Sequence, residues 1–220
     1  MPSPPSIPLF DDPPQAPARE IVAPDAVLLR GFAHADARRL LGLVERVFRA
    51  APARRMWTPG GRRMSVCSSN CGPWGWVSDR HGYRYVARDP QTYRAWPAMP
   101  DAFAVLAGAA ARAAGFGIFE PDACLINGYV PGARMALHQD RDERDVGAPI
   151  VSVSLGLPAT FLFGGLRRAD RTQRVSLLHG DVLVWGGVSR MAFHGVAPLA
   201  DGHHALLGRR RVNLTFRKAR

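Results

Sequence analysis

The chain has 220 residues, of which 47% are hydrophobic, and its 29 basic and 18 acidic residues give a formal net charge of +11. This length and composition are sufficient for one domain with a substantial core. They argue against a membrane protein, because no apolar run approaches the roughly 18 residues that a spanning helix needs. Lys218 is the only lysine, and the surplus of arginine charge indicates a polyanionic partner.

The N-terminal residues 1–20 are rich in proline and include Asp11, Asp12 and Glu20. This segment lacks the apolar core of a secretory signal and the acid-poor character of a transit peptide, so it is predicted to be a flexible arm. Residues 21–220 are predicted to form a single domain. The three cysteines are an odd number, which favours reduced thiols and a cytoplasmic protein.

Two helices are predicted in the first half of the chain. Residues 36–50 place apolar side chains at helical spacing, with Leu40, Val44 and Val47 on one face. Asp36 stands at the start of this helix, where an acidic residue acts as a cap. A second helix is expected at about 101–114, over an alanine-rich run.

From Asp122 onward the pattern changes to short strands separated by glycine and polar turns. Residues 150–157 alternate Val or Leu with Ser or Gly, as a half-buried strand does. Many short strands with the helices upstream predict an α+β, mainly β fold with a jelly-roll or sandwich core. The other expected strands are 124–129, 161–163, 175–178, 182–185, 191–196 and 211–217.

The chain contains three His-x-Asp sequences, at 34–36, 138–140 and 179–181. On a strand, residues i and i+2 point to the same face, so an imidazole and a carboxylate can converge on one metal ion. Such a pair is two-thirds of the triad that holds non-haem Fe(II) in oxygenases. Asp36 is explained by the helix start and His179-Gly-Asp181 by a turn between strands, which leaves His138 and Asp140.

The third ligand must come from elsewhere in the chain. His194 is the best placed candidate, because residues 191–195 alternate and lie among the predicted strands. Taken alone, a histidine on a strand is more often a hydrogen-bonded structural residue than a ligand. The complete set of candidates is His81, His179, His194, His203 and His204.

The last predicted strand, 211–217, alternates four polar residues with three apolar ones. Its polar face either points to solvent, as on an amphipathic edge strand, or lines the barrel as an anion-binding wall. Arg211 and Arg217 are about 20 Å apart on a straight strand, and a guanidinium binds a carboxylate through two parallel hydrogen bonds. With Asn127 and Tyr129 as neutral donors, this wall suits a dicarboxylate such as 2-oxoglutarate beside the iron.

Together these features resemble the AlkB family of Fe(II)/2-oxoglutarate-dependent dioxygenases, which oxidatively dealkylate nucleic-acid bases. The resemblance runs from about residue 56 to 217 in the family's order. The matching segments are Pro121–Tyr129, Pro131-Gly132, His138-Gln-Asp140, Ile150–Leu157, Phe163-Gly-Gly165, His179–Gly187, Phe193-His-Gly195 and Arg211–Arg217.

The resemblance implies a double-stranded β-helix core at about 120–218, with N-terminal helices and a nucleotide-recognition lid at about 54–96. It also implies Fe(II), with 2-oxoglutarate and O2 as cosubstrates. The implied iron ligands are His138, Asp140 and His194. The implied 2-oxoglutarate contacts are Asn127, Tyr129, Arg211, Asn213 and Arg217, with one arginine on each carboxylate end.

Residues 54–96 contain eight arginines, four of the five tryptophans and three of the four tyrosines. Cationic side chains interleaved with aromatic ones suit a surface that follows phosphates and stacks on bases. Alternatively the aromatic residues pack the helices on the sheet, which is the favoured interpretation for Trp57 and Trp96. By resemblance, the substrate contacts are Trp76, Tyr83, Asp142 and Arg168, with Arg84 and Tyr85 beside them.

The function implied is oxidative dealkylation of N-alkylated bases, such as 1-methyladenine and 3-methylcytosine, in DNA or RNA. The reaction is coupled to decarboxylation of 2-oxoglutarate to succinate, releases formaldehyde and repairs alkylation damage. The base is expected to be single-stranded or flipped out of a duplex, and the enzyme to be a monomer. The alternatives are a 2-oxoglutarate oxygenase of a protein or small molecule, and a non-catalytic nucleic-acid-binding jelly roll.

Overall fold

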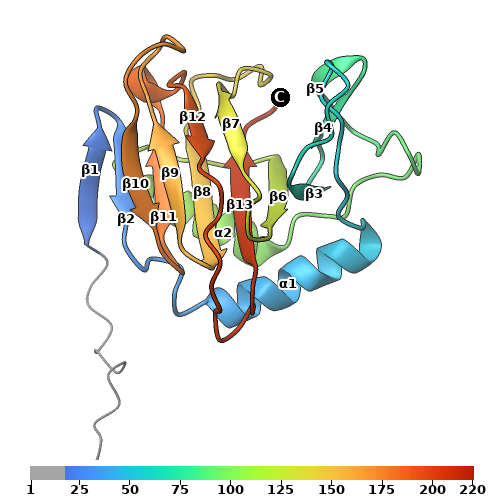
Figure 1. Cartoon of the computed structure of the whole chain (residues 1–220), viewed down its shortest axis with the longest axis horizontal. Helices are drawn as coiled ribbons and strands as arrows, with labels where there is room; N and C mark the ends of the chain where they lie inside the picture. Colours follow the sequence, from blue (N-terminus) through green and yellow to red (C-terminus); the bar gives the residue numbers. More distant parts are fainter. Residues whose placement is uncertain (1–17) are drawn as a thin grey trace, which may run out of the picture.

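The computed structural model describes residues 18–220 (Figure 1). Most of the predicted arm, residues 1–17, lies outside the described part. Arg19 and Glu20, which the prediction assigned to the arm, are instead the first residues of strand β1, because they pair with Leu29 and Leu28 of β2. Within residues 18–220 no helix is long and apolar enough to span a bilayer.

The architecture is mainly β and consists of two facing sheets with two helices on the outside of the larger one (Figure 1). The larger sheet has seven strands in the order β1-β2-β11-β8-β13-β6-β3. Their bounds are β1 Arg19–Ala23, β2 Ala26–Leu29, β11 Val182–Trp185, β8 Ile150–Gly156, β13 Arg211–Arg217, β6 Ala123–Tyr129 and β3 Cys67–Cys71.

The helices α1 (Ala37–Ala50) and α2 (Asp101–Ala113) cover one face of this sheet. Both lie within a residue of their predicted bounds. Their buried residues form one core with the apolar side of β13, namely Val212, Leu214 and Phe216. Asp36 occupies the N-cap position of α1, as predicted, but its side chain accepts no capping hydrogen bond.

The opposite face of the seven-stranded sheet meets a four-stranded sheet in the order β10-β9-β12-β7. Leu183 and Trp185 of β11 pack there with Phe161 and Phe163 in a second core. The two facing antiparallel sheets confirm the predicted jelly-roll. The bounds of the smaller sheet are β10 Gln173–Leu177, β9 Ala159–Phe163, β12 His194–Val196 and β7 Met135–His138.

Two of these strands are shorter than the sequence pattern indicated. The strand predicted at 191–196 begins only at His194, because the chain forms a 3-10 turn over Gly187–Ser189 and continues as a turn. Strand β7 ends at His138. Asp140 therefore lies in the loop beyond the strand, and it is not the second residue of an extended pair.

Strands β4 (Gly75–Asp79) and β5 (Gly82–Val86) form a separate two-stranded hairpin within the predicted lid. Figure 1 shows this hairpin standing beside β3 and β6 at the end of the seven-stranded sheet. Trp96 lies beneath it, with its indole Nε1 donating to the Val86 carbonyl at 3.0 Å. The range predicted as the lid also contains β3, which belongs to the seven-stranded sheet, and its other residues form loops and isolated bridges.

Phe103 of α2 is completely buried and meets Phe216 of β13 edge to face, with ring centroids 6.0 Å apart. Replacing Phe103 with alanine leaves a cavity between helix and sheet, so we expect a loss of about 3–5 kcal/mol in the free energy of unfolding. Val105 on the same helix is 70% exposed, and Val105→Ala is the matched control. Urea denaturation measures both, and equal stabilities would contradict this packing.

Candidate active site

A cavity of about 730 Å³ opens between the two sheets and the β4–β5 hairpin. Its wall combines polar residues of β6 and β13 with the end of β7, the start of β12 and two aromatic residues of the hairpin. This volume falls within the range of about 300–1,000 Å³ that small-molecule sites occupy. The cavity is thus the candidate active site.

Three potential metal ligands, His138, Asp140 and His194, meet at the wall of this cavity. Strands β7 and β12 pair antiparallel with His194 directly opposite His138, which brings their ring centroids to 4.4 Å. Asp140 Oδ1 lies 3.6 Å from His138 Nε2, and its Oδ2 lies 3.8 Å from His194 Nε2. All three ligand atoms lie within 4.8 Å of one another. The antiparallel pairing thus assembles a 2-His-1-carboxylate set.

The hydrogen bonds of the two histidines leave the correct nitrogen free for a metal. His138 Nδ1 lies 2.9 Å from the Ala136 carbonyl, and His194 Nδ1 lies 3.0 Å from the Ala192 carbonyl. A carbonyl oxygen only accepts, so each Nδ1 carries the proton. In a neutral ring the lone pair is then on Nε2, the atom that faces Asp140.

Burial and charge set the protonation states that a divalent cation requires. Burial, together with the nearby His138, lowers the pKa of His194 to about 4, so its ring is neutral near pH 7. Burial alone would raise the pKa of Asp140, but the positive charge of Arg217 outweighs it and lowers that pKa. A neutral imidazole beside an ionised carboxylate fits Fe(II), whose ligands must be deprotonated.

A buried network of charges surrounds Asp140. Arg217 donates to Asp140 Oδ2 through Nε at 2.8 Å and forms an ion pair to it through Nη2 at 2.7 Å. Arg190 donates from Nη1 to the backbone carbonyl of Asp140 at 2.7 Å and from Nη2 to Glu143 at 3.1 Å. The hydroxyl of Tyr85 donates to the other oxygen of Glu143 at 2.6 Å. These contacts fix the loop that carries the acidic ligand.

Four of the five residues predicted to bind 2-oxoglutarate line the cavity, from the two paired strands β6 and β13. Neighbouring hydroxyls orient the two amides. Ser68 donates to Asn127 Oδ1 at 2.6 Å, and Thr215 donates to Asn213 Oδ1 at 2.8 Å. The polar side of β13 therefore faces inward, which excludes the alternative of an outward amphipathic edge strand. The four lining residues are Asn127, Tyr129, Asn213 and Arg217.

Arg211, the fifth residue, lies behind this wall and does not line the cavity. It is 1% exposed, and its guanidinium carbon lies 5.0 Å from the centroid of the Tyr129 ring. Only Nη2 has a partner, Ser154 Oγ at 2.9 Å, whereas Nε and Nη1 are buried without one. Burial lowers the pKa of Arg211. Two unsatisfied donors on a buried cation are suited to an anionic group such as a carboxylate.

The outer part of the cavity holds the residues expected to bind the base. The rings of Trp76 and Tyr83 are stacked, with centroids 5.5 Å apart and planes 11° apart. The indole Nε1 of Trp76 donates to Asp142 at 2.8 Å. Arg168 lies across the cavity, with Nη1 donating to the Leu137 carbonyl at 2.6 Å. All four of these residues line the cavity.

Arg84 and Tyr85, predicted to lie beside them, do not line the cavity. Arg84 points to the other face of the hairpin, where both terminal nitrogens bind Asp79. Tyr85 is buried, and its hydroxyl is occupied by Glu143. Burial raises the pKa of Tyr85. The contacts of these two side chains are therefore with Asp79 and Glu143, outside the lining of the cavity.

Other residues of the cavity escaped the sequence analysis. Trp185 and Phe161 place their rings 5.0 Å and 5.7 Å from that of His194 and close the inner end of the cavity. The sequence did carry a signal for these two residues. Side chains alternate between the two faces of a short strand, and this alternation predicts which of them face the interior. Glu143 and Arg190 gave no signal, because their pairing joins loops that are far apart in the sequence.

The rival His-x-Asp sequence at 179–181 has a structural role, as expected, whereas the side chain of Asp36 in the other one accepts no capping hydrogen bond. Asp181 is buried and accepts hydrogen bonds from the backbone of Leu178 and Gly31 and from Arg30. The ring of His179 accepts from the Gly156 amide at 2.9 Å. Burial and the nearby His204 lower the pKa of His179 to about 4. Neither pair belongs to a group of three metal ligands within residues 18–220.

Comparison with known proteins agrees with this geometry. Residues 25–217 match the 2OG-Fe(II) oxygenase superfamily. The chain is 56% identical over 211 residues to "Alpha-ketoglutarate-dependent dioxygenase AlkB" of Salmonella typhimurium, covering 96% of this chain and 97% of that protein. The Escherichia coli protein of the same name is 55% identical, over 92% of this chain and 94% of its own length. The chain belongs to the AlkB family of Fe(II)/2-oxoglutarate-dependent dioxygenases.

The fold agrees with that assignment. A solved structure described as "The structure of OsALKBH1" superposes with a TM-score of 0.81 at 27% identity, over 91% of this chain and all of that one. As a member of the AlkB family the chain is a dioxygenase that uses Fe(II), 2-oxoglutarate and O2. His138, Asp140 and His194 form its metal site.

Glu143 neutralises Arg190 and Arg217 in the interior, and its side chain is only 2% exposed. Glu143→Ala leaves buried guanidinium charge without its partner, so we expect a loss of about 3–5 kcal/mol in the free energy of unfolding. Glu45 on α1 is exposed, and Glu45→Ala is the control, with a change within about 0.5 kcal/mol. Urea denaturation measures the free energy of unfolding of both variants. A small effect of Glu143→Ala would show that the network contributes little to stability.

Proposed function

We propose that this AlkB-family enzyme removes alkyl groups from ring nitrogens of nucleic-acid bases, such as 1-methyladenine and 3-methylcytosine, and so repairs alkylation damage. The observation that carries the proposal is one cavity with two chemically different ends. Its inner end holds the three metal ligands and Arg217, with Arg211 behind the wall, and its outer end holds the stacked aromatic pair. An anionic cosubstrate suits the first end and a planar base the second.

Fe(II) with 2-oxoglutarate and O2 supplies the oxidising chemistry, in which the cosubstrate becomes succinate and CO2 and an N-alkyl carbon is hydroxylated and then lost as an aldehyde. The protein's part is binding and orientation. His138, Asp140 and His194 hold the metal through Nε2 and carboxylate atoms whose directions the backbone carbonyls and Arg217 fix. Phe161 and Trp185 exclude water from the inner wall.

The cosubstrate's two carboxylates are assigned to the two arginines of β13. Arg217 lies beside Asp140, at the metal end, whereas Arg211 is deeper along the same strand with two free donors. Asn127 and Asn213 pair with each other between the two arginines, and Tyr129 of β6 lies directly opposite Arg211. The polar face of β13 thus gives the dicarboxylate one orientation, with its keto acid end toward the metal.

The target base is proposed to lie between the Trp76–Tyr83 pair and the metal ligands, with Asp142 and Arg168 at its edge. The alkyl group of a stacked base pair cannot reach such a recessed centre, so the base enters from a single strand or flipped out of a duplex. The proposed enzyme acts on DNA or RNA as a monomer.

The purified protein with Fe(II), ascorbate and 2-oxoglutarate is expected to release formaldehyde from oligonucleotides that contain 1-methyladenine or 3-methylcytosine. His138→Ala removes a metal ligand and should abolish this release, whereas replacing the rival His179 with glutamine should leave it largely intact. Formaldehyde and succinate are measured together. Absence of turnover on both lesions by the wild-type enzyme would refute the repair function, and activity on a protein or small molecule would favour the alternative oxygenase.

Replacing Arg211 with methionine removes the buried cation but keeps most of the side-chain volume. We expect the KM for 2-oxoglutarate to rise about 10- to 150-fold, the cost of losing a charged hydrogen bond of about 1.5–3 kcal/mol. The thermal stability of the protein without cosubstrate should change little, because the loss of the single hydrogen bond to Ser154 is offset by removal of a buried charge with two unsatisfied donors. Arg210→Met, at the exposed neighbouring position, is the control. An unchanged KM would remove Arg211 from the cosubstrate site.

A further inference from the structure

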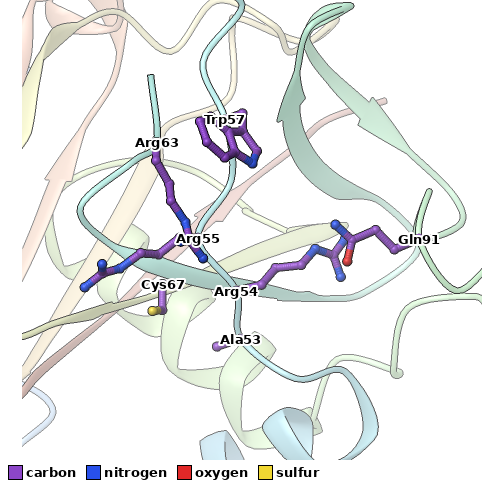
Figure 2. A pocket seen from close by; sticks show the side chains of 7 residues that line it. All are labelled: Ala53, Arg54, Arg55, Trp57, Arg63, Cys67 and Gln91. Carbon is purple, nitrogen blue, oxygen red and sulfur yellow. The ribbon is translucent and has the colours of Figure 1, made fainter. Parts of the chain in front are cut away.

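A second cavity, of about 550 Å³, lies in the lid outside the active site (Figure 2). No acidic residue lines it, and three arginines do. Trp57 and Arg63 form one side of it, and Figure 2 shows the Arg63 side chain extending toward Arg55. The lining residues are Ala53, Arg54, Arg55, Trp57, Arg63, Cys67 and Gln91.

The three arginines differ in their freedom to bind a ligand. Arg54 is held by Asp89, which accepts from both of its terminal nitrogens. Arg55 and Arg63 are exposed, and within residues 18–220 neither side chain has a hydrogen bond or an ion pair to a carboxylate. Two free guanidinium groups at one cavity repel each other unless an anion lies between them. A phosphate is the anion that suits such a pair best.

Trp57 is an exposed aromatic ring in the same cavity. The sequence analysis expected it to pack in the interior, which is wrong: 52% of Trp57 is exposed, whereas Trp96 is buried at 7%. The guanidinium of Arg63 lies 6.0 Å from the centroid of its ring. An exposed indole beside a free cation is the combination that proteins use to stack single-stranded bases.

The backbone holds this group of side chains in a fixed arrangement. Trp57 and Arg63 lie opposite each other across a tight turn closed by hydrogen bonds between Thr58 and Arg62 and from Gly61 to Thr58. Gly61 has a φ of +73°, the left-handed conformation that glycine adopts without strain. The Trp57 carbonyl accepts from the Ser78 hydroxyl on β4 at 2.6 Å. A hydrogen bond therefore connects the wall of the second cavity to β4, the strand that carries Trp76.

The second cavity adjoins the mouth of the active site. Arg63 lines both cavities, and its neighbours Arg62 and Met64 line the active site. A nucleic-acid strand that leaves the active site on this side reaches Arg63 first and Trp57 next. The two cavities thus form one basic path along the lid.

We propose that the second cavity binds a nucleotide that flanks the alkylated base on the same strand. Its base stacks on Trp57, and its phosphate lies between Arg55 and Arg63. This inference rests on the proposed function, in that the strand must carry a target base into the active site. It predicts a preference of the enzyme for oligonucleotides over isolated nucleotides.

The test measures binding of a fluorescein-labelled single-stranded 12-mer with a central 1-methyladenine, by anisotropy, to the full-length protein with Mn(II) and 2-oxoglutarate. Trp57→Ala is expected to weaken binding about tenfold, the value of one stacked base, and Trp57→Phe to restore most of the affinity. Arg55→Ala is expected to weaken binding severalfold and to reduce the salt dependence by about 0.7 in logarithmic slope. Arg39→Ala, which removes an equally exposed arginine from α1, should bind as the wild type does.

Unchanged affinity and salt slope in both Arg55→Ala and Trp57→Ala would overturn the inference, as would a loss seen with duplex but not with single-stranded oligonucleotide. Melting temperatures equal to that of the wild type exclude misfolding as the cause of a loss. Turnover of the methylated mononucleotide is measured in parallel, and neither substitution should affect it. No turnover by the wild-type enzyme on any methylated substrate would refute the proposed function while the binding result still decides the second cavity.

Discussion

The buried carboxylate of Asp140 is the interaction on which the site depends. A buried charge is stable only when opposite charges or hydrogen bonds surround it. Here Arg217 of β13 supplies the opposite charge, and the Nε2 atoms of His138 and His194 on the smaller sheet lie 3.6 and 3.8 Å from the carboxylate, so that one loop residue joins both sheets. Arg190 holds its backbone carbonyl as well. The arrangement that stabilises this charge therefore also places three metal ligands within reach of one ion.

The side chains of β13 alternate between two faces, one of which packs in the hydrophobic core while the other lines the active-site cavity. Val212, Leu214 and Phe216 pack against the two helices, while the residues between them face the cavity. β13 lies between β6 and β8 in the sheet, and all of its residues are buried. A shift of one residue in its register would exchange the two faces and remove both the core and the cosubstrate site.

The periodicity of the sequence was sufficient to predict the helices and most strands of the two sheets, because these follow from local alternation, but it left open whether the polar face of β13 points inward. The pairing of β12 with β7 and the contact of Glu143 with Arg190 were not predictable in this way. Both depend on register between segments far apart in the chain. Local pattern also failed for Trp57, since an aromatic side chain in an arginine-rich loop has the same signal whether it is buried or exposed.

The surroundings of the individual arginines show which of them contribute to the net charge of +11 without a neutralising partner. Arg190 and Arg217 are neutralised in the interior by acidic partners, and Arg54 is neutralised by Asp89 at the edge of the lid. Arg55 and Arg63 have no such partner within the described chain. Composition alone indicated a polyanion but not where it binds. Arg63 lines both the active-site cavity and the second cavity, so the unpaired charge of the lid adjoins the site that is proposed to receive the base.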